Sequence, residues 1–527
     1  MRLRRTLSAL CVGLLLTACA PAPSQLAPTP SSPSPTPIQL PIPANTWPDL
    51  ANPDRRQVDS NAKPRGFVSP PQGSGLGRYF NQKLHWQECG GFECAEFAAP
   101  LDWNNPDAQA ITISMKRATA EHNTLGSLFI NPGGPGMPAK GYVDDFHRSQ
   151  LAGYDIIGMD SRGSGDSTPV VCGTTEELDA YFAADISPDN ASEEAALADE
   201  SKKFADGCRR NSGALLDHIS TIETMYDYDL ARQLVGDEKL NFYGISYGTF
   251  LGAVYAELFP DKVGRMVLDA PVQLDPNQEV PQAVGFERAL HAWAAWCGEQ
   301  TNEICPLGNN EDEVVQTFVD FLEAVDAKPL QTGTPRQLTQ SLAVSGLAIF
   351  FYGGQEYYQQ LAQILSAAIQ TSDGSVLLMA ADQMNDRSQS GYSSLATAFP
   401  AISCADTQDD GLAASYAYWR NEVIPQAPVF GKFFGPDALC PIWTAKPMPR
   451  IKFSAAGAAP IVVVGSTLDS ATPYEQAVTM ADSLESAVLV TREGPGHGSL
   501  GDSECVDKAV FNYLNHGRVP AEGTRCR

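Results

Sequence analysis

The chain has 527 residues, of which 43% are hydrophobic and 19% are charged. This composition supplies enough apolar side chains for a large buried core, and it excludes a wholly disordered or collagen-like chain. The 62 acidic residues outnumber the 36 basic ones, and the formal net charge is −26. A nucleic acid is therefore not expected as a partner, because nucleic-acid binding depends on clustered Lys and Arg.

Residues 1–19 have the pattern of an export signal. Arginines precede an apolar stretch at 7–16 that is shorter than the ~20 residues of a membrane-spanning helix. The signal ends in Leu-Thr-Ala-Cys at 16–19, which resembles the lipobox of bacterial lipoproteins. That resemblance implies that Cys19 carries the lipid that anchors the exported chain to the outer face of a bacterial cell membrane, from which it can be shed. The alternative is an ordinary secretory signal in which Cys19 has no role.

Ten of the twelve cysteines follow this signal. An even number in an exported chain indicates disulfides, although sequence alone leaves their connectivity open. Pairing of neighbours closes five local loops, and we expect Cys89–Cys94, Cys172–Cys208, Cys297–Cys305, Cys404–Cys440 and Cys505–Cys526. The chain has no CxxC pair and no HExxH motif, so neither a metal nor an organic cofactor is expected.

After the signal, residues 20–43 contain nine prolines among Ala, Ser and Thr, and polar sequence with further prolines continues to about residue 75. Such a composition does not support a packed core. It predicts a flexible tether over 20–75, with the folded body starting near Leu76.

In the body, short apolar runs alternate with helical patterns. Strands are expected at 111–115, 127–130, 154–159, 240–243, 266–268, 461–464 and 487–490, and helices between them at 222–234, 250–258 and 474–484. This alternation predicts an α/β fold with a mostly parallel central sheet flanked by helices. The alternation stops over 274–449, where helices are expected at 286–296, 313–327 and 357–369. We therefore expect an α/β core formed by 76–273 and 450–527, interrupted by a helical cap insertion over 274–449.

The clearest chemical motif is G-x-S-x-G at 244–248, with Ser246 at its centre. It lies between an expected strand and an expected helix, which is the setting of a nucleophile elbow. The glycines leave room at a strained turn, and the helix N-terminus favours the negative charge that develops there. Ser246 is therefore the candidate nucleophile.

A serine nucleophile needs a base, and the base needs an orienting carboxylate. Asp469 and His497 follow the expected strands at 461–464 and 487–490, and each lies near the carboxyl end of its strand, where open α/β sheets bind ligands. The order Ser, Asp, His is that of the α/β-hydrolases. Asp469 and His497 are the candidate acid and base.

The oxyanion of a tetrahedral intermediate needs hydrogen-bond donors. The N–H of Tyr247, next to the nucleophile, is one candidate. The loop at 131–136 follows an early strand and is rich in glycine, which permits close backbone approach. It supplies Gly134 as the second candidate and Gly133 as the next, unless the loop is only a tight turn.

Seven segments together resemble the exported tripeptidyl-aminopeptidase-like branch of the α/β-hydrolases, relatives of the proline iminopeptidases. They are NPGGPG at 131–136, DSRGSGDSTPVVC at 160–172, YDYDLARQLVG at 226–236, NFYGISYGTFLG at 241–252, AISCADT at 401–407, LDSATPY at 468–474 and GPGHG at 494–498. The resemblance implies a serine exopeptidase that cuts short peptides, tripeptides in the named branch, from free N-termini and acts without a cofactor.

The resemblance also assigns tasks to residues outside the triad. Acidic groups of the cap receive the α-ammonium of the substrate in this family, and Asp406 and Glu356 are the candidates here, against the alternative of solvated surface carboxylates. Thr472 lies at the family's Thr-Pro position and would support the acid loop or simply cap a helix. The cap region matches the family least, so the cleavage register of one, two or three residues stays open.

Two other functions remain as alternatives. A carboxylesterase with the same triad would act on acyl esters, and it would not need a site for an ammonium group. A non-catalytic surface lipoprotein would use the fold for binding, which the presence of all three triad residues disfavours. We expect a monomer that meets the membrane only through its lipid anchor.

Overall fold

The computed structural model describes residues 38–55, 66–122, 125–146 and 148–527. The expected signal, Cys19 and residues 20–37 and 56–65 of the expected tether lie outside these residues. The fold described below is that of the unit formed by 39–527. In the described ranges, no helix combines the length and the apolarity that crossing a membrane requires.

The centre of this unit is a ten-stranded sheet in the order β1-β2-β3-β5-β4-β6-β7-β10-β11-β12. Its strands are β1 (Gln87–Cys89), β2 (Phe92–Pro100), β3 (Ala110–Ala118), β4 (Ser127–Asn131), β5 (Asp155–Met159), β6 (Leu240–Ile245), β7 (Val263–Asp269), β10 (Ile461–Leu468), β11 (Ala487–Pro495) and β12 (Thr524–Cys526). The strands from β5 to β12 pair in parallel, and β1, β2 and β3 add an antiparallel edge.

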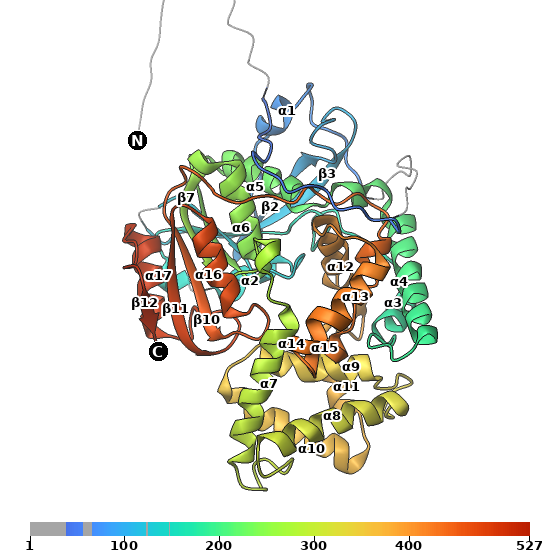
Figure 1. Cartoon of the computed structure of the whole chain (residues 1–527). Helices are drawn as coiled ribbons and strands as arrows, with labels where there is room; N and C mark the ends of the chain where they lie inside the picture. The colour runs from blue at the N-terminus through green and yellow to red at the C-terminus, as the bar shows by residue number, and fades with distance from the viewer. Residues whose placement is uncertain (1–37, 56–65, 123–124, 147) are drawn as a thin grey trace, which may run out of the picture. The chain divides into compact units, whose positions relative to one another are not determined.

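Helices cover both faces of this sheet (Figure 1). Ile461 and Val463 of β10 face one core with α5 (Thr221–Val235), α6 (Tyr247–Leu258) and α16 (Tyr474–Ser483). Val462 and Val464 face the other core with α2 (Ala139–Asp145) and α17 (Glu504–His516). The alternation follows from the two-residue period of a strand, and it explains why the central strands are continuous apolar runs. The expected α/β class is confirmed.

The region after β7 is mainly helical. Its first helices are α7 (Gln282–Gly298), α8 (Glu311–Ala327), α9 (Gln340–Ala348), α10 (Tyr358–Thr371) and α11 (Ser375–Met384), which Figure 1 shows gathered below the sheet. These helices share their own apolar core with α15 (Phe430–Phe434). By contrast, α12 (Leu395–Asp406) contributes Ala398, Ala401 and Ile402 to the core of the sheet. The helical region is thus packed in two places rather than as one separate body.

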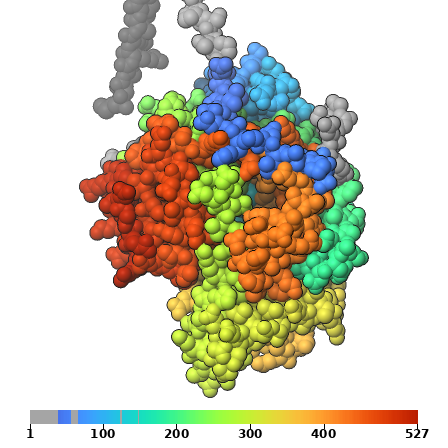
Figure 2. All heavy atoms as spheres, viewed as in Figure 1, coloured from blue at the N-terminus to red at the C-terminus, as the bar shows by residue number. Residues whose placement is uncertain are grey.

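The folded unit begins earlier than the sequence predicts. The segment 39–55, which we call the N-terminal segment, lies across the helical region, as Figure 2 shows. Thr46 bridges Ile451, and Arg55 forms an ion pair of 2.8 Å with Asp409. The prediction of a flexible tether as far as residue 75 is wrong for this segment, because its backbone and side chains have fixed partners on the body.

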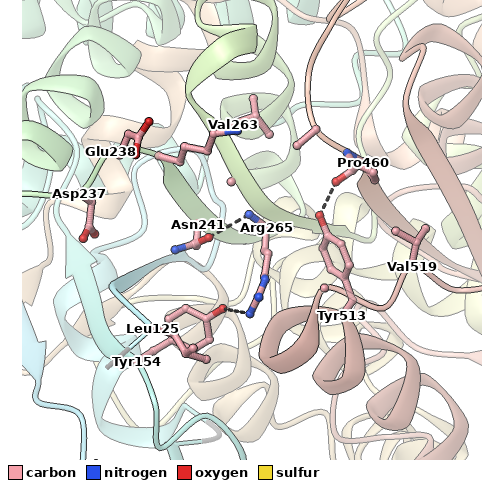
Figure 3. Close-up of a pocket in the computed structure, with 14 residues that line it drawn as sticks. Leu125, Tyr154, Asp237, Glu238, Asn241, Val263, Arg265, Pro460, Tyr513 and Val519 are labelled. Carbon is pink, nitrogen blue, oxygen red and sulfur yellow. Dashed lines mark hydrogen bonds between the residues drawn. The ribbon is translucent and has the colours of Figure 1, made fainter. Parts of the chain in front are cut away.

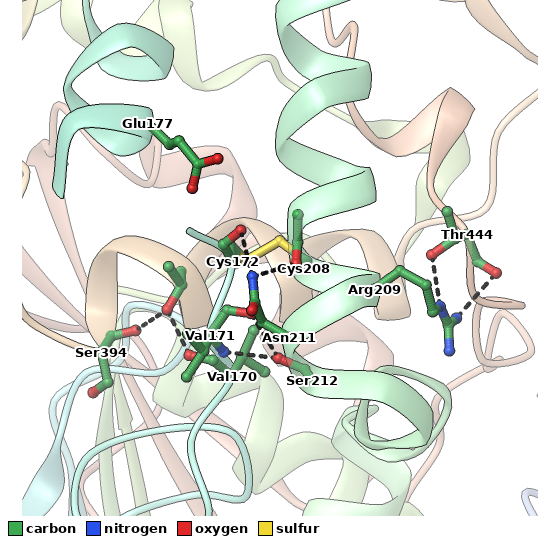
Figure 4. Close-up of a disulfide and its surroundings, with 12 residues drawn as sticks. Val170, Val171, Cys172, Glu177, Cys208, Arg209, Asn211, Ser212, Ser394 and Thr444 are labelled. Atoms are coloured by element: carbon green, nitrogen blue, oxygen red, sulfur yellow. Dashed lines mark hydrogen bonds between the residues drawn. A yellow bond between two sulfur atoms is a disulfide. The ribbon is translucent and has the colours of Figure 1, made fainter. Parts of the chain in front are cut away.

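Ten cysteines form five disulfides, and each joins neighbouring cysteines: Cys89–Cys94, Cys172–Cys208, Cys297–Cys305, Cys404–Cys440 and Cys505–Cys526. Figure 4 shows how Cys172–Cys208 ties the segment after β5 to α4 (Ala191–Ser212). Asn211 and Ser212 of that helix hydrogen-bond to the backbone of Cys172 and Val171. The disulfide therefore reinforces a contact that hydrogen bonds already make.

Candidate active site

Ser246 occupies the turn between β6 and α6. Its φ of 56° lies in the left-handed region, which a residue with a side chain rarely adopts. A Cβ at Gly244 would lie 2.4 Å from the carbonyl oxygen of Gly248, and a Cβ at Gly248 would lie 2.8 Å from that of Asn131. The two glycines of the motif are thus required by close backbone contacts, and the strained serine has the geometry of a nucleophile elbow.

The structure brings Asp469 and His497 together. His497 Nδ1 lies 2.9 Å from Asp469 Oδ1 and 3.1 Å from Oδ2. Asp469 Oδ1 also accepts hydrogen bonds from the N–H groups of Ala471 and Thr472, at 3.0 and 2.9 Å. The carboxylate is therefore fixed by its own loop, and it fixes the imidazole in turn.

The environment of His497 favours its charged form. Burial of the ring lowers its pKa, but the Asp469 carboxylate, through its charge and hydrogen bond, and the charge of Asp269 together raise the pKa above the ordinary histidine value. The ring of Tyr352 stands edge-on to the His497 ring, with 5.3 Å between the ring centres. The backbone N–H of His497 donates to the carbonyl of Tyr352 at 2.9 Å. A base held in this way is suited to take and return a proton.

Thr472 lies beside the acid and the base. Its Oγ1 is 3.4 Å from His497 Nδ1, in addition to the hydrogen bond from its N–H to Asp469. The residue that caps α16 is Pro473, so capping of that helix is not the role of Thr472. The contacts are those of a residue that supports the acid loop.

The candidate oxyanion donors come from two loops that meet at Ser246. Tyr247 is the first residue of α6, where backbone N–H groups have no partner within the helix. Gly133 is so close to the elbow that a Cβ there would lie 2.6 Å from the carbonyl oxygen of Ile245. The N–H of Gly133 donates to the Asn131 side chain at 2.9 Å, whereas that of Gly134 has no acceptor among the residues that the structure describes. Gly134 is therefore the donor that remains free.

Ser246 lies where two cavities meet. The first, of about 630 Å³, also contains His497, and we call it the apolar limb after its lining by Met137, Phe182, Ile349, Tyr352, Met384 and Phe399. The second, of about 470 Å³, we call the polar limb, since the charged side chains of Glu279, Asp406 and Arg450 line it beside Gln273. Apolar side chains, Trp47 among them, also line it. Phe399 of α12 lines both limbs and is 47% exposed.

Asp406 is placed at the wall of the polar limb. Its carboxylate accepts hydrogen bonds from the N–H and the hydroxyl of Thr221, at 2.9 and 2.7 Å, and from the hydroxyl of Tyr247. Burial raises the pKa of Asp406 to about 6, and these hydrogen bonds limit the rise. A carboxylate has about four acceptor positions, so one is left for a further donor.

Glu356 is not brought to the site. It is exposed, it accepts a hydrogen bond from the N–H of Gly354 at 3.1 Å, and it lines neither limb. The prediction that it receives the substrate is wrong for a geometric reason: its side chain turns back onto the loop before α10.

Sequence reasoning missed three residues of this region. Trp47 lines the polar limb from a segment expected to be a tether, and a single aromatic residue among prolines was the only available signal. Arg450 shares that limb. Asp269, at the end of β7, is fully buried and accepts hydrogen bonds on Oδ2 from Tyr243, Ser499 and Leu500, which ties it to the His497 loop.

A cavity of about 490 Å³ at the other edge of the sheet shows no comparable chemistry (Figure 3). It lies at the amino ends of β6 and β7. Two cations, Lys239 and Arg265, are among its lining residues, and Arg265 is bound to the Tyr154 hydroxyl at 3.0 Å and to the carbonyl of Leu514. Across the described ranges, no cluster of three His, Cys, Asp or Glu side chains could hold a metal ion.

Known proteins resemble this chain over most of its length. The serine protease Hip1 of Mycobacterium tuberculosis is 32% identical over 481 residues, which cover 84% of this chain and 91% of that protein. Carboxylesterase B of the same organism is 32% identical over 82% of this chain and 86% of its own, and the tripeptidyl aminopeptidase of Streptomyces lividans is 28% identical over 84% and 86%. The TAP-like protein family profile matches residues 427–526, which contain Asp469 and His497. The chain belongs to the TAP-like serine peptidases of the α/β-hydrolase fold.

Proposed function

We propose that this protein is an extracytoplasmic exopeptidase that releases short peptides, most often tripeptides, from free peptide N-termini. The observation that carries the proposal is the acidic side chain of Asp406 on the wall of a cavity that also contains Ser246. An endopeptidase or an esterase has no need of a carboxylate there, whereas an aminopeptidase must hold an α-ammonium group at a fixed distance from its nucleophile.

In the proposed reaction, Ser246 Oγ attacks the carbonyl carbon, and Nε2 of His497 takes the hydroxyl proton. Asp469 stabilises the imidazolium through its contact with Nδ1, which is 2.9 Å away. The N–H groups of Tyr247 and Gly134 donate to the oxyanion. His497 then gives its proton to the departing amine, and water releases the acyl group from Ser246 by the same steps.

Five disulfides are typical of proteins outside the reducing cytoplasm. We propose in addition that Cys19 carries a lipid anchor and that the chain acts as a monomer, with helices α7 to α11 as a cap that admits chain ends.

The test compares the chain without residues 1–19 with its Ser246→Ala variant. Substrates are di- and tripeptide anilides with a free amine, the same anilides N-acetylated, and a short acyl ester. Cleavage of the free-amine anilides alone, lost in the variant, supports the proposal and gives the register. Ester cleavage that ignores the free amine would favour the carboxylesterase activity after which one relative is named. Equal activity of the two proteins would refute Ser246 as the nucleophile.

A further inference from the structure

The two limbs differ in chemistry, and only one of them contains the base. His497 lines the apolar limb and does not line the polar limb. In a serine peptidase the base that took the proton from the nucleophile must deliver it to the nitrogen of the departing amine. The departing part of the substrate therefore has to lie on the side of Ser246 where His497 lies.

The polar limb suits the other half of the substrate. It contains the carboxylates of Asp406 and Glu279 and joins the apolar limb only around Gly134, Ser246 and Phe399. A peptide bound with its ammonium group at Asp406 and its reactive carbonyl at Ser246 fills the polar limb. The chain beyond the cleaved bond then enters the apolar limb.

We propose that the apolar limb is the binding site for the first residue after the cleaved bond and that it selects a large apolar side chain there. This inference rests on the proposed exopeptidase function and extends it to the substrate class. The walls formed by Phe182, Ile349 and Tyr352 offer no charge to an acidic or basic side chain at that position.

Exposure of the lining supports this assignment. Met137 and Phe399 are 39% and 47% exposed, although both line the cavity that contains Ser246 and His497. Apolar groups left open at a site are commonly covered by a ligand. Apart from the base His497, the charged residue among those that line this limb is Asp386. It is an exposed side chain that accepts a hydrogen bond from the Ser393 hydroxyl, and its charge disfavours an acidic side chain further.

The test uses peptides with one fixed N-terminal portion, of the length found with the anilides, followed by Leu, Phe, Gly or Asp and then a glycine amide. The value kcat/KM reports acylation, the step in which the departing residue is bound. We expect Leu and Phe to exceed Gly and Asp by about tenfold or more, since adding a single methylene in an apolar pocket changes this ratio by roughly that factor.

Met384→Lys adds a cation to the apolar limb and should reduce the Leu-to-Asp ratio at least tenfold. The matched control is Met379→Lys on the same helix. The Met379 side chain is 64% exposed and lies outside both limbs, so the Leu-to-Asp ratio should not change in this variant. A ratio measured within one preparation does not depend on the fraction of protein that is folded.

A second measurement needs no variant. The acyl group on Ser246 can pass to an added amine instead of water: the amine nitrogen bonds to the carbonyl carbon, the bond to Oγ breaks, and the amine proton passes through His497 to Oγ. Leucine amide should capture the acyl group at least tenfold better than glycine amide or aspartic acid amide.

The outcomes separate the two proposals. Cleavage that depends on Ser246 and on a free amine, with equal rates for Leu, Gly and Asp, would overturn the apolar-limb assignment alone. A preference for apolar residues before the cleaved bond, with none after it, would also overturn it. A Leu preference that persists in N-acetylated peptides would refute the exopeptidase proposal and leave the assignment standing.

Discussion

At the residue scale, one side chain links the turn of Ser246 to the wall of the polar limb. Tyr247 follows Ser246 at the start of α6, and its hydroxyl binds the Asp406 carboxylate. Thr221 holds the same carboxylate with two further hydrogen bonds. The distance between Ser246 and Asp406, the proposed ammonium site, is therefore set by a single aromatic ring, which is a rigid spacer.

The ionisation of Asp406 predicts a pH dependence that only free-amine substrates show. Its pKa is raised to about 6, so the carboxylate becomes neutral as the pH falls through that value, while an α-amino group with a pKa of about 7.7–8.0 stays charged. We expect KM for a free-amine peptide to rise about tenfold from pH 7 to pH 5. The ratio to the N-acetylated peptide removes effects of the triad.

Two variants test this prediction. Asp406→Asn should raise KM for the free-amine peptide at pH 7 and remove the pH dependence of the ratio. Glu356→Gln, an equal change at an exposed carboxylate outside both limbs, should alter neither. Equal losses for free-amine and N-acetylated substrates in Asp406→Asn would mean that Asp406 only supports Tyr247.

Asp269 is the second residue with a predicted kinetic signature. It is buried near the base, and its negative charge raises the pKa of His497. Asp269→Asn removes this charge, so the pKa of His497 should fall. Because His497 must be neutral to accept a proton, the fall of kcat/KM on the acidic side of its pH profile should move to lower pH. Tyr243→Phe, which removes one hydrogen bond to Asp269 at 2.9 Å and keeps its charge, is the control. If the acidic side of the pH profile is unchanged in Asp269→Asn, Asp269 carries no charge in that pH range.

At the scale of elements, the helical region and the triad loops are joined through the backbone. The hydroxyl of Ser470, next to the acid, donates to the carbonyl of Phe351 at 2.7 Å, and the N–H of His497 donates to the carbonyl of Tyr352. The successive carbonyls of Phe351 and Tyr352, at the end of η5 (Ile349–Phe351), thus fix the acid loop and the base loop relative to each other. Displacing that turn would misalign acid and base together.

The N-terminal segment forms a comparable contact with the polar limb. The backbone N–H of Trp47 donates to the carbonyl of Arg450 at 2.7 Å, and Lys452 Nζ lies 4.4 Å from the centre of the Trp47 ring. We expect Trp47→Ala to lower kcat/KM for free-amine tripeptide anilides about tenfold, because a wall of the polar limb is removed. Trp86→Ala, which removes a ring stacked on Arg117 at the far edge of the sheet, should leave this value unchanged. A normal kcat/KM in Trp47→Ala would show that the ring does not contact the substrate.

At the scale of the whole molecule, the disulfides differ in the length of the loop that each one closes. Cys404–Cys440 and Cys172–Cys208 span 36 residues each, and Cys89–Cys94 spans 5. Loop-closure entropy assigns about 4 kcal/mol to the long loops and about 2 kcal/mol to the short one. The Cys404→Ala/Cys440→Ala pair should lower Tm more than the Cys89→Ala/Cys94→Ala pair, as measured by calorimetry. The reverse order would mean that strain in the native state outweighs the entropy of the unfolded chain.

The sequence was sufficient for the parallel part of the sheet up to β11, because a buried parallel strand is a continuous apolar run. All seven expected strands overlap observed ones. The strands β1 and β12, three residues each, were too short to give a pattern, and the nine-residue edge strand β2 was also not predicted. Ser246, Asp469 and His497 could be proposed because each follows a strand with glycines nearby. Asp269 also follows a strand, but only the fold shows that Ser499 and Leu500 bind it. Trp47 could not be found, since its contact with Arg450 joins positions some 400 residues apart.

The place of Trp47 in the chain has a consequence for proteolysis of the N-terminus. Because Trp47 precedes α1 (Gly77–Phe80), proteolytic removal of the N-terminal segment would take away a wall of the polar limb while leaving the triad whole. Such a removal would change which peptides are cleaved without abolishing hydrolysis. Proteolysis at the N-terminus would then alter the substrate specificity of the enzyme rather than its amount, and preparations that begin at different residues would show different specificities.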